Sequence, residues 1–140
     1  MLKVGTKARD GGTFVGSSPT VGKPMYVETK IPGVDSQRMS WIEAMKTDRK
    51  QNEHAEWTAK SEGVGRPPNG SAWHLPTVEE AKLLNEFFNT SASGKIRDLE
   101  EGMWTGTYRE KGPIFLKSSG EPVAEDRTAV HPVCWVRYAP

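Results

Sequence analysis

The sequence predicts an α+β fold in which two helices pack on a small antiparallel sheet, with long irregular loops between them. At Ser40 and at Thr77 the chain has a hydroxyl residue three positions before a glutamate, and this spacing is typical of a helix amino terminus. The last third of the chain holds short segments rich in aromatic and β-branched residues, which indicate strands. Helices segregated from a late group of strands are typical of the α+β class.

The first helix is expected to begin after Ser40, whose side chain can accept a hydrogen bond from the amide of Glu43. Trp41, Ala44 and Met45 follow at i, i+3 and i+4, which places them on one apolar stripe. The stripe predicts a helix that ends near position 50. Residues 51–71 are polar and finish in a stretch of glycine and proline at 63–70, so a long loop is expected there.

The second helix is predicted by the capping box of Thr77 and Glu80, with Pro76 fixing the approach of the chain. Its apolar positions recur at helical spacing and form a face that must pack on other elements. These positions are Val78, Ala81, Leu84 and Phe88, widened by Leu83 and Phe87.

Strands are predicted at 13–15 and 24–27 near the amino terminus, and at 103–108, 114–117 and 133–138 in the last third. Each segment is short and bounded by glycine or proline, as in small antiparallel sheets. A length of 140 residues fits one domain, so we expect a single domain over 1–140. It divides into a strand-and-turn segment at 1–35 and a main domain at 36–140.

Composition restricts the classes of partner. Nineteen basic residues balance 18 acidic ones, so the charge of +1 gives no reason to expect nucleic acid or an anionic membrane. Cys134 is the one cysteine, which excludes an internal disulfide and any zinc site built from several thiolates. No segment has the apolar run of a signal peptide or a transmembrane helix, so we expect neither a signal peptide nor a membrane-spanning segment.

Several segments, taken in order, resemble one known family. They are SWIEA at 40–44, WHLPTVEE at 73–80, WTGT at 104–107 and CWVR at 134–137, preceded by DGGTFVGSSPT at 10–20. The chain resembles the bacterial and phage domain of unknown function that ends collagen-like adhesins and many phage tail proteins. Its superfamily is C-type-lectin-like and includes sulfatase-modifying enzymes and the variable proteins of diversity-generating retroelements.

The resemblance implies a C-type-lectin-like fold and a non-enzymatic binding or structural module. The implied protein is a phage virion component, either a capsid decoration protein or a tail-associated receptor-binding protein, made in the host cytoplasm. Its implied partners are other virion proteins of the capsid or tail, or a host-surface receptor, and a homo-oligomer is expected. No cofactor, nucleic acid or membrane insertion is implied. Two alternatives stay open: a bacterial surface adhesin domain, and an enzyme of the sulfatase-modifying type.

Together with this resemblance, the sequence predicts a set of structural core residues and a set of surface residues that contact a partner. The expected structural core consists of Trp41, Trp73, Leu75, Pro76, Thr77, Leu84, Trp104, Cys134 and Trp135. In this fold the chain between the core strands, at about 109–132, is the long loop region where relatives bind. The expected contact surface consists of Tyr108, Arg109, Lys111, Phe115, Lys117, Asp126 and Arg127.

No catalytic or metal-binding set is expected from the remaining residues. Cys134 lies within a strand pattern that favours burial over nucleophilic chemistry. The histidines at 54, 74 and 131 lack the i, i+4 spacing of a zinc motif, and His74 is expected to pack or hydrogen-bond. The acidic group of Glu121, Glu125 and Asp126 is interpreted as a solvated loop, although a calcium ion there stays open.

Paired glutamates at 79–80 and 100–101 do not predict an acid and base pair, because neighbouring helix residues do not face one another. The first pair is explained by helix capping and by the favourable helix dipole.

Overall fold

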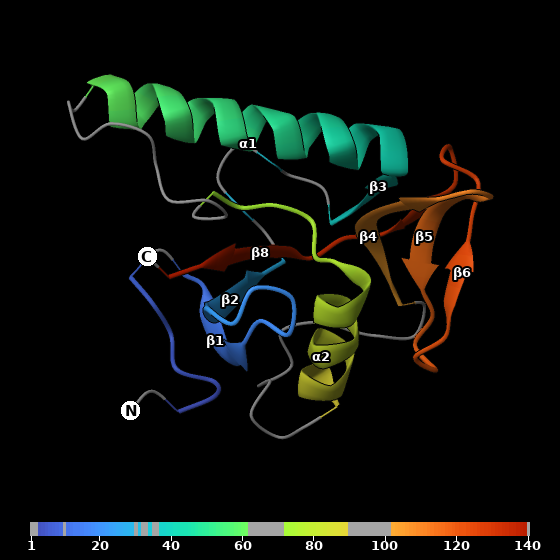
Figure 1. The fold of residues 1–140 in the computed structure, drawn as a ribbon, viewed down its shortest axis with the longest axis horizontal. Helices are drawn as coiled ribbons and strands as arrows, with labels where there is room; N and C mark the ends of the chain where they lie inside the picture. The colour runs from blue at the N-terminus through green and yellow to red at the C-terminus, as the bar shows by residue number, and fades with distance from the viewer. Residues whose placement is uncertain are drawn as a thin grey trace.

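The computed structural model describes residues 3–9, 11–29, 31, 34, 37–61, 72–89 and 102–139, with the side chains of 54–61 left aside. Two helices and eight strands follow one another in the order β1, β2, β3, α1, α2 and β4 to β8 (Figure 1). The helices are α1 at Trp41–Ser61 and α2 at Val78–Phe88. The strands are β1 Thr13–Ser17, β2 Pro24–Glu28, β3 Arg38–Ser40, β4 Met103–Arg109, β5 Gly112–Leu116, β6 Pro122–Ala124, β7 Val130–Pro132 and β8 Trp135–Tyr138.

The fold is α+β, with two helices packed on three small antiparallel sheets, where the sequence predicted a single sheet. The sheets have the strand orders β1-β2-β8, β3-β7 and β4-β5-β6. The late strands separate because β8 pairs with β2, which sets Met25 opposite Tyr138, while β5 pairs with both β4 and β6. The amino-terminal strands and the last strand therefore share one sheet.

Helix α1 is longer than the sequence analysis predicted, because residues 51–61 continue it where a loop was expected. These residues are polar but contain neither glycine nor proline, and Gln, Glu, Ala and Lys among them have high helix propensity. A polar stretch of this composition is therefore compatible with a helix. The expected loop at 62–71 and the glutamates at 100–101 lie outside the described residues.

Both predicted helix starts are confirmed by hydrogen bonds. The Ser40 hydroxyl accepts from the Glu43 amide at 3.3 Å. At α2 the capping box is complete: the Thr77 hydroxyl accepts from the Glu80 amide at 3.2 Å, and Glu80 Oε1 accepts from the Thr77 amide at 3.0 Å. The predicted apolar face of α2 is buried, apart from Leu83, which is only partly buried.

The core consists of two clusters. The first lies between α2, the β1-β2-β8 sheet, the start of β4 and the end of β5, and it includes Leu84, Met103 and Cys134. The second lies under α1 and includes Ala44 and Trp104. Each helix thus covers its own cluster, and the 72–77 segment runs between the two helices (Figure 1).

Candidate functional site

Three of the residues predicted for the contact surface lie at one end of the β4–β5 hairpin. Arg109 pairs with Gly112, so the strands are joined by a two-residue turn that contains Lys111. Tyr108, Arg109 and Lys111 are all exposed, and Tyr108 leaves 57% of its surface to solvent although its ring packs on Trp41 at 5.5 Å. A short hairpin presents these side chains from ordered backbone.

The loop between β6 and β7 brings Asp126 and Arg127 to the same end of the molecule. The Glu125 amide donates to the Pro113 carbonyl at 3.0 Å, which holds the start of the loop beside the hairpin turn. The Arg127 carbonyl accepts from the Ile42 amide at 3.4 Å, so the loop also borders the first turn of α1 (Figure 1). We call Tyr108, Arg109, Lys111, Asp126 and Arg127 the hairpin-end surface.

Two predicted contact residues lie elsewhere. Phe115 is 6% exposed and belongs to the second core cluster, since its side chain points inward from the central strand of its sheet. Its place on the predicted surface is therefore wrong. Lys117 is exposed but follows the opposite end of β5, where it pairs with Glu121 at 3.8 Å. The structure thus brings five of the seven predicted residues together.

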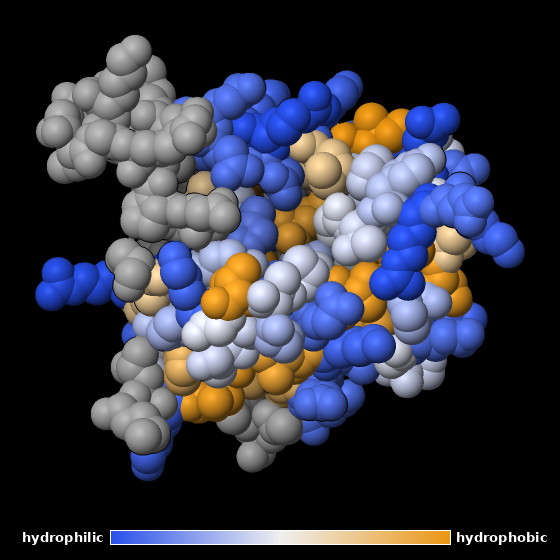
Figure 2. Space-filling model, in the orientation of Figure 1, coloured by the Kyte–Doolittle hydropathy of each residue, from blue (hydrophilic) through white to orange (hydrophobic). Residues whose placement is uncertain are grey.

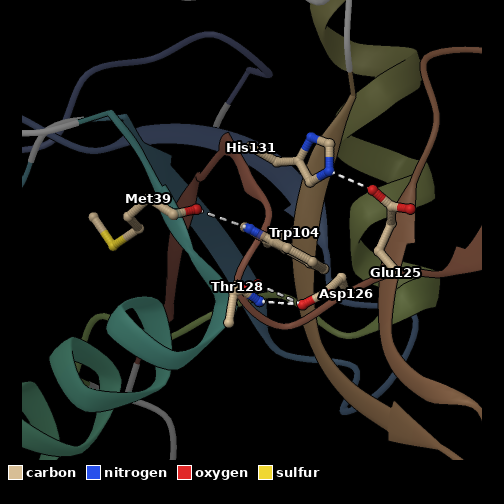
Figure 3. A network of polar contacts seen from close by, with 6 residues as sticks. All are labelled: Met39, Trp104, Glu125, Asp126, Thr128 and His131. Carbon is tan, nitrogen blue, oxygen red and sulfur yellow. Dashed lines mark hydrogen bonds and ion pairs between the residues drawn. The ribbon is translucent and has the colours of Figure 1, made fainter.

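Polar contacts among residues of β3, β4, β7 and the β6–β7 loop lie near Asp126 of the hairpin-end surface (Figure 3). His131 Nε2 lies 2.6 Å from a carboxylate oxygen of Glu125, and the imidazole stacks on Phe115 at 4.1 Å between ring centroids. It also meets the edge of Trp104 at 5.1 Å, and Trp104 donates from Nε1 to the Met39 carbonyl at 2.9 Å. His131 Nδ1 is buried with no hydrogen-bond partner in the described part of the chain. A hydrogen on Nε2 donated to Glu125 is therefore the less costly tautomer.

The three carboxylates of the acidic loop turn to different partners. Glu121 pairs with Lys117, and Glu125 pairs with His131. Asp126 accepts from the Thr128 hydroxyl at 2.6 Å and from the Thr128 amide at 2.8 Å (Figure 3). These hydrogen bonds, the side-chain one first, lower the pKa of the Asp126 carboxyl. Within the described ranges no three His, Cys, Asp or Glu side chains are grouped to hold a metal ion.

Most of the predicted structural core is buried. The buried residues are Trp73, Leu75, Pro76, Leu84, Trp104, Cys134 and Trp135. Thr77 is half-buried at its capping position, and Trp41 is also half-buried, which corrects its place in the core. Trp41 lies at the rim because its indole donates to the Thr105 carbonyl at 3.0 Å while one face borders Tyr108.

Cys134 and His74 take the structural positions expected of them. The Cys134 thiol is fully buried in the first core cluster, away from solvent. His74 pairs through its backbone with Val136, and its Nδ1 lies 2.9 Å from the Ala72 carbonyl. Its ring meets Tyr138 edge-on at 4.9 Å. The side chain of His54 is not among those described.

A second candidate site, which the sequence analysis missed, is an open cleft of about 350 Å³ between α1, the 74–77 segment and β4. The surface is hollowed beneath α1 in the space-filling view (Figure 2). Its polar lining includes Asp48, Asn52, His74 and Thr107. We call this the α1 cleft. The volume of the α1 cleft falls within the range of small-molecule binding sites, which is about 300–1,000 Å³.

Asp48 is the acidic group of the α1 cleft. Its Oδ2 accepts from the Leu75 amide at 2.9 Å, and its Oδ1 accepts from Asn52 Nδ2 at 3.0 Å. Burial raises the pKa of the Asp48 carboxyl above its ordinary value, against the lowering effects of the Leu75 hydrogen bond and the nearby His74. Met45, Asp48 and Asn52 follow the i, i+3, i+7 spacing of one helix face. The sequence analysis missed this shared helix face because it predicted that the helix ends near position 50.

Neither helix, in the residues that the structure describes, has an apolar stretch able to cross a bilayer. The chain was also compared with protein-family models, with curated proteins and with solved structures. None of the three comparisons finds a match.

Proposed function

We propose that this protein is a non-enzymatic recognition module of a phage virion, either a capsid decoration protein or a tail-associated protein. In this proposal the α+β fold is C-type-lectin-like, and the hairpin-end surface contacts a protein partner of the capsid, the tail or the host surface. The burial of Trp73, Trp104 and Trp135 between the helices and the strands supports the fold assignment.

The observation that carries the binding role is the exposed apolar area beside the hairpin-end surface. Tyr108, Val130 and Ile42 leave 57%, 54% and 37% of their surfaces to solvent. Val130 pairs with Ser40 and Ile42 follows two positions later, so both border the first turn of α1. Exposed apolar groups rimmed by charged ones mark protein contact sites.

The chemistry of the rim indicates the kind of partner. Arg109, Lys111 and Arg127 supply three positive charges against the negative charges of Glu110 and Asp126. Tyrosine and arginine are the residue types enriched at binding hot spots. A protein surface that offers an apolar patch with acidic residues at its edge would complement this arrangement.

The first test is to purify phage particles from a lysate of the producing host and to identify their proteins by mass spectrometry. We expect the chain in the particles at a stoichiometric copy number. Its absence from purified particles would contradict the virion assignment. Recovery in a cell-envelope fraction would favour the adhesin alternative.

The second test examines the surface itself by binding purified variants to particles that lack the protein. We expect Tyr108→Ala combined with Lys111→Glu to weaken binding by about tenfold or more, because a hot-spot aromatic and a rim charge are lost. Lys117→Glu is the matched control, since it makes the same charge change at the far end of β5. Equal losses in both variants would show that the hairpin-end surface is not the contact.

A further inference from the structure

We propose that the α1 cleft binds an ammonium group carried on a short aliphatic chain, with Asp48 as its counter-ion. The proposal rests on the residues that line the cleft, and it is independent of the virion assignment. Its ligand could come from a small free amine or from a lysine side chain of a partner, because both present the same chemistry.

The charge of the cleft is the first observation. Its lining contains one carboxylate, Asp48, and no lysine or arginine. His74 and Arg49 lie near enough for their charges to lower the pKa of the Asp48 carboxyl, but within the described part of the chain no basic side chain contacts Asp48 within the 4.0 Å of a salt bridge. A partly buried carboxylate without a cation in direct contact carries a desolvation cost that a bound cation offsets. The raised pKa of the Asp48 carboxyl reflects the same cost.

The geometry of Asp48 is the second observation. One of its oxygens accepts from the Leu75 amide and the other from Asn52, so the carboxylate is held in place before any ligand arrives. An ionised carboxylate has about four lone-pair positions, and these two bonds leave acceptor capacity on each oxygen. A fixed carboxylate loses little freedom on binding, which favours affinity.

His74 adds a second acceptor when its imidazole is neutral. Its Nδ1 lies 2.9 Å from the Ala72 carbonyl oxygen, which can only accept, so Nδ1 carries the hydrogen of that bond. In the neutral ring Nε2 is then a lone-pair acceptor. The lining therefore offers acceptors that suit an ammonium donor, and its carboxylate repels carboxylate and phosphate ligands.

The remaining lining is apolar and limits the size of the ligand. Met45, Leu75, Pro76 and Val21 contribute hydrocarbon to the walls. Gly106 also lines the cleft, and a Cβ built there would meet Leu75 Cβ at 3.4 Å, so the missing side chain keeps this side open. A cleft of about 350 Å³ accommodates a chain of a few methylene groups beside the carboxylate.

The experiment titrates the full chain with butylammonium chloride, and with butanol and sodium butanoate as uncharged and anionic controls. We expect butylammonium alone to bind, with a Kd of about millimolar for so small a ligand. Amide NMR of the wild-type protein locates the site, because the Leu75 amide donates to Asp48 and should shift on binding. Equal binding of butanol, or shifts that leave Leu75 unchanged, would overturn the proposal.

Substitutions test the role of the carboxylate. Asp48→Asn keeps an oxygen for the Leu75 amide but removes the charge, and we expect butylammonium binding to weaken about tenfold or more. Glu53→Gln makes the same charge change at an exposed position of α1 outside the lining and should bind as the wild type does. Unchanged butylammonium binding by a folded Asp48→Asn variant would also contradict the proposal. If that variant fails to fold, the amide NMR shifts of the wild-type protein with butylammonium, butanol and butanoate still test the proposal.

A last arm identifies the source of the ammonium group. N-acetyl-lysine N-methylamide carries the same four-carbon amine on a capped backbone. If this compound binds as well as butylammonium does, the cleft admits a lysine side chain of a partner. If only butylammonium binds, the ligand is a small free amine.

Discussion

Glu80 links three segments of the chain through one side chain. It is fully buried, although a glutamate in the first turn of a helix is usually exposed. Besides the Thr77 amide, it accepts from the hydroxyls of Ser18 and Tyr138, both at 2.5 Å to Oε2. These hydrogen bonds join α2 to the loop after β1 and to the end of β8, so one carboxylate fixes how the helix lies on the sheet.

Glu80→Gln should destabilise the fold by about 3 kcal/mol. The groups around this side chain are all donors, so the NH2 of glutamine would face another donor and leave a buried hydroxyl without an acceptor. Urea denaturation measures the change in the free energy of unfolding. Glu79→Gln is the matched control, since it removes the same charge from the same helical turn at an exposed position. The control should lose no more than the dipole contribution of about 0.3–1 kcal/mol. Similar losses in both variants would contradict this role of Glu80.

The hydrogen bond between Tyr138 and Glu80 makes the stability of the fold dependent on pH. Burial raises the pKa of its phenol well above the ordinary value, and the hydrogen bond to Glu80 and the charge of Glu80 raise it further. The unfolded chain loses this proton near pH 10, roughly, whereas the folded chain keeps it. The free energy of unfolding should therefore be unaffected by Tyr138 below that pH and should fall as pH rises above it.

Titration of the phenol by absorbance checks the cause of this shift. In Glu80→Gln the pKa of Tyr138 should move down toward its ordinary value, because two of the three raising effects are removed and only burial remains. Tyr138→Phe identifies the signal by difference. An unchanged Tyr138 titration in the Glu80→Gln variant would show that burial alone sets the pKa.

At the scale of secondary structure elements, the start of β4 depends on a glycine. Gly102 has a φ of 96°, in the left-handed region that favours glycine. A Cβ built there would overlap the carbonyl oxygen of Leu116 on β5. The close approach of the two backbones lets β4 and β5 begin their pairing at Met103 and Leu116.

Gly102→Ala should therefore cost at least about 2 kcal/mol more than Gly120→Ala in thermal or urea unfolding. Gly120 has a φ of 93° but nothing lies within 4 Å of a Cβ built there, so both variants share the same backbone strain. That shared strain is about 1–2 kcal/mol. The difference between the two variants isolates the overlap with Leu116, and equal stabilities would show that the hairpin can shift to admit a side chain.

At the scale of the whole molecule, β2 connects the two ends of the described chain. It lies between β1 and β8, and Met25 and Val27 from β2 are fully buried in the first core cluster. Residues 1–35 were predicted to form the strand-and-turn segment of a single domain, ahead of its main part at 36–140. In the structure this segment supplies the central strand β2 and part of the first core cluster, so residues 36–140 pack against it.

A fragment of residues 36–140 should fail to form a cooperative fold. Without β2, strand β8 loses its pairing partner and α2 loses apolar surface against which it packs. Circular dichroism during thermal unfolding and resistance to limited proteolysis would measure this, with the full chain as the reference. Addition of a peptide covering residues 10–30 should restore part of the structure. A fragment that unfolds cooperatively by itself would contradict this dependence.

The predicted elements followed from local signals that needed no partner in space. The Thr77 capping box and the apolar face of α2 are set by hydrogen bonds and periodicity within eleven helical residues and the position before them. The strands at β1, β2, β4, β5 and β8 were located from aromatic and β-branched composition between turns. Tyr108, Arg109 and Lys111 were placed on a surface because the family resemblance implies a binding loop region at about 109–132, and loops on a rigid scaffold carry recognition.

Tertiary structure alone decided the pairing of the strands, the inward side chain of Phe115 and the burial of Glu80. Hydrogen bonds between strands depend on which edges meet, and no short stretch of sequence specifies that. The α1 cleft required the same information, because Asp48 and Leu75 are distant in sequence and meet only when α1 lies along the 72–77 segment. The sequence by itself determined where both helices begin and where β1, β2, β4, β5 and β8 form, since those signals are local. The site arises from long-range contacts, which only the folded chain contains.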